Sequence, residues 1–277
     1  MRRSNTRSNF HTKGVFNNSI LGFLIALIAI TPSAFAADLS GKKEMASDVI
    51  QDIKEMTKET FTDKRNLKIM GVTALGSLIL INTEADEDIK DWFDDRGFSS
   101  AYGKAGNVLG VSGPILLNLG LYAHGHVKDN DRSTEVARIL TTALAVDGIS
   151  TGAMKIAIGR HRPDDGGSRE FDPFTFSNRS FPSGHTSFSF TAATVMAEMY
   201  EEKRWVKYTG YTAATLVGIF RIDDESHWAS DVLFGAVKGY LIGKTVTKFH
   251  KNPRLENVSI IADVRDGDSY VGLGFRF

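Results

Sequence analysis

The sequence predicts a mainly α-helical bundle followed by a small C-terminal β-hairpin, and two patterns lead to this fold class. In the second half of the chain, apolar residues recur at helical spacing in segments separated by short loops. Near the C-terminus, apolar and polar residues alternate on both sides of an Asp-Gly pair, which is typical of a hairpin. The four helices expected in the second half cover residues 134–158, 184–202, 206–221 and 228–249.

The first 36 residues have the pattern of a secretory signal peptide. Four basic and no acidic residues accompany the apolar run Ile20–Ile30, and Ala34-Phe35-Ala36 forms a small-residue cleavage site before Ala37. The run has 11 residues, fewer than the roughly 20 that cross a bilayer as a helix. Removal of the segment is therefore favoured over an uncleaved anchor, and we expect export to the periplasm.

Residues 37–134 are predicted to form the N-terminal helical part of the bundle. Residues 38–66 carry apolar positions at near-helical spacing, which indicates an amphipathic surface helix. The acidic stretch from Glu84 to Asp95 lacks the ligand spacing and central glycine of a calcium loop, so a solvated connector is expected. Residues 105–127 contain no Lys, Arg, Asp or Glu and could cross a membrane by length, but their polar side chains favour a buried, glycine-rich helix pair.

Residues 251–277 are predicted to form the hairpin. Its strands cover 257–264 and 269–277, on either side of Asp266 and Gly267. One hairpin cannot close a barrel, so we expect it to pack on the bundle or pair with another copy. The aromatic last strand raises an outer-membrane location as an alternative.

The composition narrows the classes of function. The chain has 33 basic and 33 acidic residues, but beyond residue 36 the balance is 29 to 33, a net charge of −4. A mildly acidic chain gives no support for nucleic-acid binding. The chain has no cysteine, which excludes disulfides, thiol nucleophiles and thiolate metal sites.

Three short segments carry the predicted chemistry. They are Lys155-x6-Arg162-Pro163, Pro182-Ser183-Gly184-His185 and Arg221-x5-His227-x3-Asp231. Guanidinium groups match the oxygens of phosphate, and a lysine adds a point charge. The glycine turn leads into an apolar helix, whose first backbone N–H groups can bind an anion. Together these groups indicate a phosphate-binding site.

His227 and Asp231 stand four residues apart, so they can meet on one helical face. A carboxylate that binds one ring nitrogen fixes the tautomer and leaves the other nitrogen free to attack, which suits a nucleophile and its orienting group. Taken singly, this pair could be a surface ion pair and Ser183 an ordinary helix N-cap. The joint occurrence of all three segments favours phosphoryl transfer.

In combination, the segments resemble the signature of the type 2 phosphatidic acid phosphatase (PAP2) superfamily, which includes bacterial acid phosphatases, lipid phosphate phosphatases and vanadium haloperoxidases. That signature reads Lys-x6-Arg-Pro, Pro-Ser-Gly-His and Ser-Arg-x5-His-x3-Asp. One departure is Phe220, where the family has serine before the arginine. The resemblance implies a PAP2-type helical bundle with its catalytic core at residues 135–250.

The resemblance also implies roles for the matching residues. His227 attacks phosphorus to form a phosphohistidine, Asp231 orients it, and His185 protonates the leaving oxygen and then activates water. The phosphate oxygens are held by Lys155, Arg162, Ser183, Gly184 and Arg221. No metal or other cofactor is implied, and vanadate is expected to act as an inhibitor. His161 matches no position of the signature and is expected to be structural.

We therefore expect a metal-independent phosphatase that hydrolyses phosphate monoesters in the periplasm, with small organic phosphates or lipid phosphates as substrates and no nucleic-acid partner. One alternative is a membrane-associated phosphatase of lipid phosphates or polyprenyl diphosphates, and peripheral membrane contact fits either form. A second is a vanadate-dependent haloperoxidase, which uses the same anion site with vanadate as its cofactor. A third is a non-enzymatic interaction protein with a vestigial site.

Overall fold

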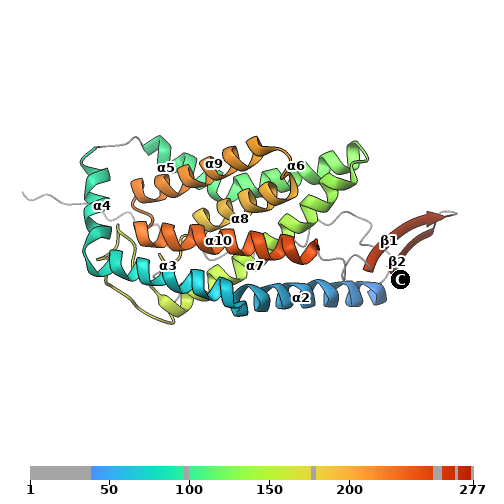
Figure 1. Ribbon diagram of the computed structural model, residues 1–277, viewed down its shortest axis with the longest axis horizontal. Helices are drawn as coiled ribbons and strands as arrows, with labels where there is room; N and C mark the ends of the chain where they lie inside the picture. The colour runs from blue at the N-terminus through green and yellow to red at the C-terminus, as the bar shows by residue number, and fades with distance from the viewer. Residues whose placement is uncertain (1–38, 97–99, 176–178, 252–257, 266–267, 276–277) are drawn as a thin grey trace, which may run out of the picture. The chain divides into compact units, whose positions relative to one another are not determined.

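A computed structural model describes the backbone of residues 39–96, 100–175, 179–251, 258–265 and 268–275. The predicted signal peptide lies outside these residues. The first half contains α2 (Leu39–Thr62), α3 (Lys64–Asn82), α4 (Ala85–Asp94), α5 (Ser100–Asn107), the π-helical turn η2 (Val108–Ser112) and α6 (Gly113–Val127). The second half contains α7 (Asp131–Ile158), α8 (Gly184–Met199), α9 (Arg204–Asp223), α10 (Ala229–His250), β1 (Val258–Arg265) and β2 (Asp268–Phe275) (Figure 1).

Helix α8 is central to the bundle, because it packs against α7, α9 and α10. The main hydrophobic cluster lies where α2, α7, α8 and α10 meet, with Met56, Leu140, Val195 and Ile242 fully buried. The four helices predicted between residues 134 and 249 are confirmed, each with ends that differ by only a few residues. The mainly α-helical fold class is also confirmed.

A buried polar network crosses this core and includes residues from the first two turns of α8. The Lys238 ammonium of α10 pairs with the Asp147 carboxylate of α7, and both side chains are fully buried. Asp147 also accepts hydrogen bonds from Ser187 and Thr191 of α8, each at 2.7 Å. Because a buried charge needs both a counter-ion and hydrogen bonds, this network fixes how the three helices pack.

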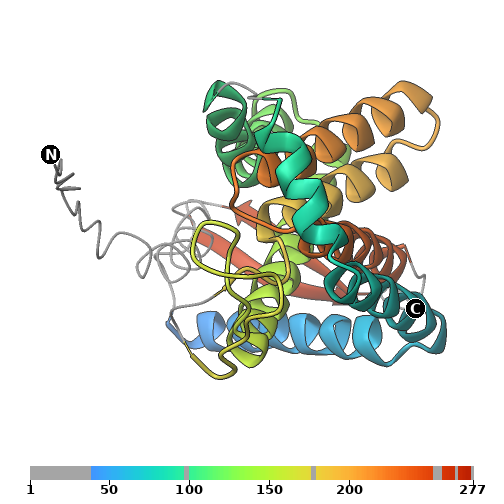
Figure 2. The ribbon, with the colours of Figure 1, turned by 90° about the vertical axis from the view of Figure 1, so that its left-hand side faces the viewer.

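The acidic stretch that the sequence analysis predicted to be a solvated connector is instead the helix α4. It bends away from α3 by 68° and lies across the ends of the long helices (Figures 1 and 2). Asp86 of α4 is 1% exposed. The prediction was wrong because it treated all the acidic residues alike, whereas one of them has a buried cationic partner.

The predicted buried helix pair at residues 105–127 is also wrong. Elements α5, η2 and α6 form one run, and the helix Tyr102–Val127 is largely exposed, with only 22% of its most apolar window buried. In the part of the chain that the structure describes, this helix is long and apolar enough to cross a membrane. The bent pair α3–α4 would be a second such element if it is counted as one broken span.

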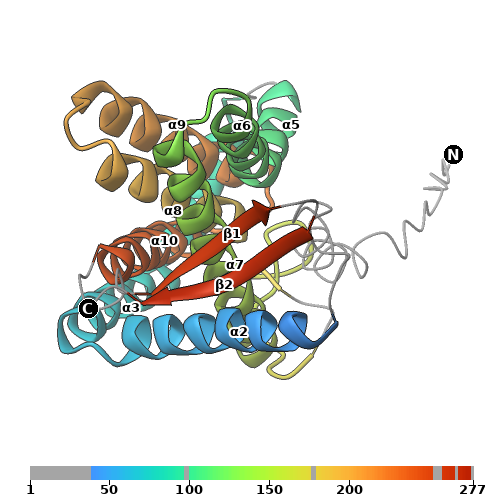
Figure 3. The same cartoon turned by 90° about the vertical axis from the view of Figure 1, so that its right-hand side faces the viewer.

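The predicted hairpin is present. Strands β1 and β2 pair antiparallel, with Val258 opposite Phe275 and Arg265 opposite Asp268 (Figure 3). This register pairs the strands on either side of Asp266 and Gly267, which lie outside the described residues.

Candidate active site

Lys155 of the first segment lies in the last turn of α7 and binds the loop before the second segment. Its ammonium donates hydrogen bonds to the carbonyl oxygens of Arg179 and Ser180, at 2.5 and 3.1 Å. Burial and the charge of Arg162 lower the pKa of Lys155 well below its usual value. Lys155 therefore fixes the loop that leads into the Pro-Ser-Gly-His segment.

Arg162 follows α7 and connects the first segment to the third. Its guanidinium donates a hydrogen bond to the Ser226 carbonyl at 3.1 Å, one residue before His227. Arg162 thus lies near His227, and its charge contributes to lowering the pKa of that ring.

The Pro-Ser-Gly-His segment forms the start of α8. Ser183 stands at the N-cap position, but its hydroxyl contacts the Thr186 hydroxyl at 2.9 Å and caps no backbone N–H. Ser183 therefore does not act as an ordinary N-cap, which was the alternative role for this residue. A Cβ on Gly235 of α10 would lie 2.6 Å from the Ser183 carbonyl oxygen, so the close approach of α10 to this turn requires glycine. The first N–H groups of α8 suit an anion.

Arg221 comes from the end of α9 and is held from two sides. Its guanidinium donates to the Asn107 side-chain oxygen at 2.8 Å and to the Asp224 carboxylate at 2.6 Å. The side chain of Arg221 is only 4% exposed. Asp224, inside the third segment, therefore has a role of its own, because its carboxylate orients Arg221.

The two histidines lie in a cationic environment. His227 is 2% exposed, and burial, followed by the charges of Lys155, Arg162 and Arg221, lowers its pKa well below the usual value. Burial, followed by the charges of Arg221, Lys155 and Arg162, lowers the pKa of His185 to about 3. The structure thus brings both histidines and the three predicted cations together.

The predicted pairing of His227 with Asp231 is close but indirect. Nδ1 of His227 lies 3.6 Å from the nearer Asp231 oxygen, which is longer than a hydrogen bond. Ser180 lies between them: its hydroxyl donates to Asp231 at 2.5 Å and its oxygen is 3.4 Å from Nδ1. The backbone N–H of Trp228 also donates to Asp231, at 3.0 Å. Sequence analysis missed Ser180, which belongs to none of the three segments.

Sequence analysis also missed Arg160, which is fully buried and donates to Asp231 at 2.5 Å. Arg160 in turn pairs with Asp86 of α4 at 2.7 Å. Two features of the sequence could have pointed to this pair. Arg160 stands two residues before Arg162, and Asp86 lies on the buried side of α4. Neither feature identifies its partner, since the two residues are 74 positions apart.

The π-helical turn η2 packs against the same site. A Cβ on Gly110 would lie 2.6 Å from the Cβ of His185, so glycine allows this turn to reach the histidine. Asn107, the partner of Arg221, immediately precedes η2. Single π-helical turns inside helices are often found at functional sites. The candidate membrane helix therefore contacts two of the predicted catalytic and phosphate-binding residues.

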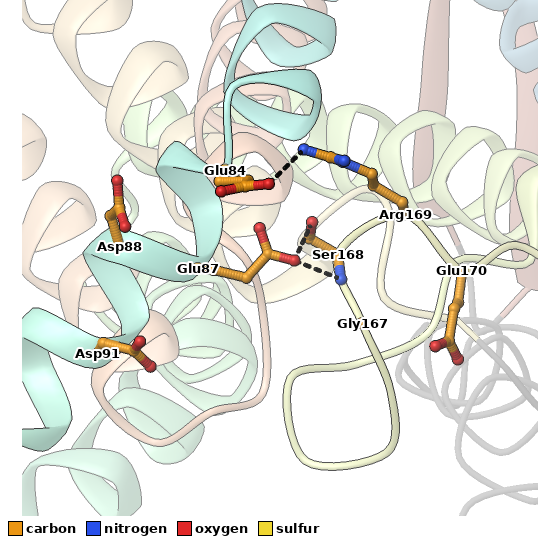
Figure 4. A pocket seen from close by; sticks show the side chains of 8 residues that line it. All are labelled: Glu84, Glu87, Asp88, Asp91, Gly167, Ser168, Arg169 and Glu170. Carbon is orange, nitrogen blue, oxygen red and sulfur yellow. Dashed lines mark hydrogen bonds and ion pairs between the residues drawn. The ribbon is translucent and has the colours of Figure 1, made fainter.

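A separate pocket of about 360 Å³ lies between α4 and residues 167–170 (Figure 4). Its acidic lining would repel a phosphate group, so this pocket does not suit a phosphate ester. The residues that line it are Glu84, Glu87, Asp88, Asp91, Gly167, Ser168, Arg169 and Glu170.

Comparison with known proteins places the similarity in the same part of the chain as the three segments. Residues 136–254 match the family model described as the PAP2 superfamily. A lipid A 1-phosphatase from Porphyromonas gingivalis is 33% identical over 169 residues, which cover 60% of this chain and 35% of the relative. Lipid phosphate phosphatase 1 from Arabidopsis thaliana is 30% identical over 145 residues, or 41% of this chain and 44% of the relative.

The chain thus spans less than half the length of these two curated relatives. Among solved structures, a transmembrane PAP2-type phosphatidylglycerolphosphate phosphatase from Bacillus subtilis is similar to 74% of this chain and 95% of its own, with 20% identity and a TM-score of 0.37.

Proposed function

We propose, from the premise that residues 136–254 belong to the PAP2 superfamily, that the protein is a membrane-associated phosphatase that hydrolyses lipid phosphates. One observation carries this proposal: a buried histidine, His227, lies among three cations beside a second histidine and an uncapped helix N-terminus. Phosphoryl transfer needs fixed positive charge around the phosphate oxygens, a nucleophile in line and an acid at the leaving oxygen. Each of these requirements has a residue that can meet it.

The first step forms a phosphohistidine. Nε2 of His227 bonds to phosphorus while the bond from phosphorus to the ester oxygen breaks, and His185 gives that oxygen a proton. Ser180 donates its hydroxyl proton to Asp231, so its oxygen can accept a hydrogen bond from Nδ1–H of His227. This arrangement favours the tautomer in which Nε2 carries the reactive lone pair.

In the second step water replaces the histidine. His185 takes a proton from water as the water oxygen bonds to phosphorus, and the bond between phosphorus and Nε2 breaks to release inorganic phosphate. His185 must be protonated for the first step, although burial and the neighbouring cations lower its pKa to about 3. The negative charge of a bound phosphate offsets these cations and therefore raises the pKa of His185 toward neutrality.

We propose that the reaction uses no metal ion, because Lys155, Arg162 and Arg221 supply the positive charge that stabilises the transition state. The Ser183 hydroxyl and the N–H groups that begin at Gly184 complete the set of donors to the phosphate oxygens. Vanadate resembles the transition state of phosphoryl transfer, so it is expected to bind these residues as an inhibitor.

Two observations favour a lipid over a small soluble ester. The named relatives include a lipid A 1-phosphatase and a lipid phosphate phosphatase. The helix Tyr102–Val127 contacts Arg221 and His185 through Asn107 and Gly110, and it exposes large apolar side chains to its surroundings. A lipid tail could lie along this helix while the phosphate reaches the cations. The same surface supports association with a membrane.

The test measures phosphate release by detergent-purified protein in the presence of EDTA. Phosphatidic acid in mixed micelles, a polyprenyl diphosphate and p-nitrophenyl phosphate are compared, each with and without vanadate. We expect vanadate-sensitive release from the lipid monoester that exceeds release from p-nitrophenyl phosphate. The His227→Ala variant should lose at least roughly 1,000-fold in kcat, because the nucleophile is removed.

Three results would contradict the proposal. Equal activity in His227→Ala would exclude the histidine nucleophile, and loss of activity with EDTA would exclude the metal-free reaction. A clear preference for p-nitrophenyl phosphate would exclude the lipid substrate. Acid-quenched samples should also contain phosphate bound to histidine in the unaltered protein and none in His227→Ala.

Export is a separate proposal that depends on residues 1–36. N-terminal sequencing of the protein recovered from a periplasmic and membrane fraction is expected to begin at Ala37. A chain recovered with its first 36 residues intact would contradict cleavage.

A further inference from the structure

We infer that Asp86 is a positioning residue of the active site, which acts on Asp231 and His227 through the buried Arg160. This inference rests on the proposed phosphatase function. It assigns a role in catalysis to a residue of α4, which precedes the residues that match the family model, 136–254.

The geometry links Asp86 to Asp231 through one guanidinium group. Nη2 of Arg160 donates to Asp86 at 2.7 Å, and Nη1 donates to Asp231 at 2.5 Å. The three side chains are each completely buried. Ser230 closes the arrangement, because it accepts from Nη1 of Arg160 at 2.7 Å and donates to Asp86 at 2.5 Å. Arg160 therefore cannot move without displacing both carboxylates.

The charges explain why a second carboxylate is needed. If Arg160 paired with Asp231 alone, its positive charge would cancel the negative charge that stabilises His227 as positive charge develops on the attacking ring. Asp86 takes up the charge of Arg160, so the three groups together carry a net charge of −1. Such electrostatic effects are strong here because water is excluded from all three side chains.

Further hydrogen bonds hold α4 and Arg160 in place. Glu87, the next residue of α4, accepts hydrogen bonds from the hydroxyl and the backbone N–H of Ser168, at 2.6 and 3.3 Å (Figure 4). The Ser168 carbonyl accepts from Nε of Arg160 at 2.9 Å. The backbone N–H of Ser230 donates to Asp86 at 2.9 Å. These bonds place Asp86 firmly, as a positioning role requires.

The experiment compares Asp86→Asn with Asp88→Asn, which makes the same change on an exposed residue of the same helix. Both are assayed with phosphatidic acid in mixed micelles, beside the unaltered protein and His227→Ala. We expect Asp86→Asn to lower kcat roughly 10- to 100-fold with KM within about threefold, since Asp86 supports a reacting group and does not touch the phosphate. Asp88→Asn should retain full activity.

A double substitution tests whether Asp86 acts through Arg160. In the Arg160→Gln background, Asp86→Asn should lower kcat by less than about threefold, because the charge that it balances is gone. The double variant leaves no unpaired cation in the core, so it keeps the test valid if Asp86→Asn alone fails to fold. Melting curves for each variant separate loss of fold from loss of rate.

Three outcomes would overturn the inference. They are equal kcat in Asp86→Asn and Asp88→Asn, a change in KM without a change in kcat, and an equal loss from Asp86→Asn in both backgrounds. Each would leave the proposed phosphatase intact if the unaltered protein still shows release that depends on His227. Absence of that release in the unaltered protein would overturn the proposed function, and this inference with it.

Discussion

His185 makes the stability of the protein depend on pH, because burial and the cations that suit a phosphate lower its pKa only in the folded state. Its pKa is about 3 in the folded protein, below the ordinary value of 6.5, because of burial and three nearby cations. Between pH 6.5 and pH 3 the unfolded chain therefore binds the proton more strongly. Stability contributed by this residue is fully present above pH 6.5 and is lost as the pH falls toward 3.

We predict that His185→Gln makes the melting temperature less dependent on pH in this window. One group contributes at most about 1.4 kcal/mol to the unfolding free energy for each pH unit. Melting curves at pH 7.5 and pH 5 for both proteins would measure the difference. Vanadate should reduce the acid sensitivity of the unaltered protein, because a bound anion raises the pKa of His185. A variant with unchanged pH dependence would contradict the assignment of this effect to His185.

Among secondary-structure elements, the π-helical turn η2 has the closest relation to the site. A Cβ on Gly110 would lie 2.6 Å from the Cβ of His185. We predict that Gly110→Ala lowers kcat at least roughly tenfold and destabilises the fold by about 1–3 kcal/mol, as expected for overpacking.

Gly120→Ala in α6 is the matched control for this prediction. A Cβ there has nothing within 4 Å, and alanine favours a helix by about 0.5–1 kcal/mol over glycine. Thermal melting should therefore show lower stability for Gly110→Ala and higher stability for Gly120→Ala. Kinetic assays should show a reduced kcat only for Gly110→Ala. Normal kcat in Gly110→Ala would show that η2 does not position His185.

The elements also show how far the sequence could predict this protein. Helical periodicity located α7 to α10 well, and the three segments identified residues that the fold brings together. The failures were α4, Arg160 and Ser180. In each case the deciding contact joins a polar residue to a partner elsewhere in the fold, as Asp86 joins Arg160 across 74 positions. Local patterns describe one side of such a pair and leave its burial unspecified.

Residues 105–127 were misjudged for a different reason. Their glycines and polar residues suggested a buried position, but several of them serve contacts on one side only, such as Asn107 with Arg221 and Gly110 with His185. The other side exposes Val108, Leu109 and Leu116. Composition alone averages these two sides and therefore understates the apolar surface.

For the whole molecule, the large apolar side chains that it exposes support the proposed association with a membrane. Large apolar side chains are exposed on α3, η2, α6 and α9, including Leu75, Val108, Leu116 and Trp205. Soluble monomers rarely expose apolar patches larger than a few hundred Å². A membrane would cover this surface and would also bring the protein to the lipid phosphates proposed as its substrates.

We predict that the protein floats with phospholipid vesicles, and that Val108→Asn combined with Leu116→Asn weakens this association at least roughly tenfold, since each buried aliphatic side chain contributes about 1.5–3 kcal/mol. Ile149→Asn, on an exposed apolar residue of α7, is the control. Vesicle flotation of the three proteins measures the effect. Equal flotation of the double variant would show that the helix Tyr102–Val127 does not contact lipid.

The pairing of Asp86 with Arg160 has a consequence for how this protein can vary. The matched region, residues 136–254, contains Arg160 and the histidines, whereas the partners Asp86 and Asn107 precede it. The two parts are therefore not interchangeable modules. A chimera that joins this core to the preceding helices of another relative would remove one acceptor from Arg160 and one from Arg221, unless those helices carry equivalent residues. The natural unit of exchange is the core together with α4 and α5.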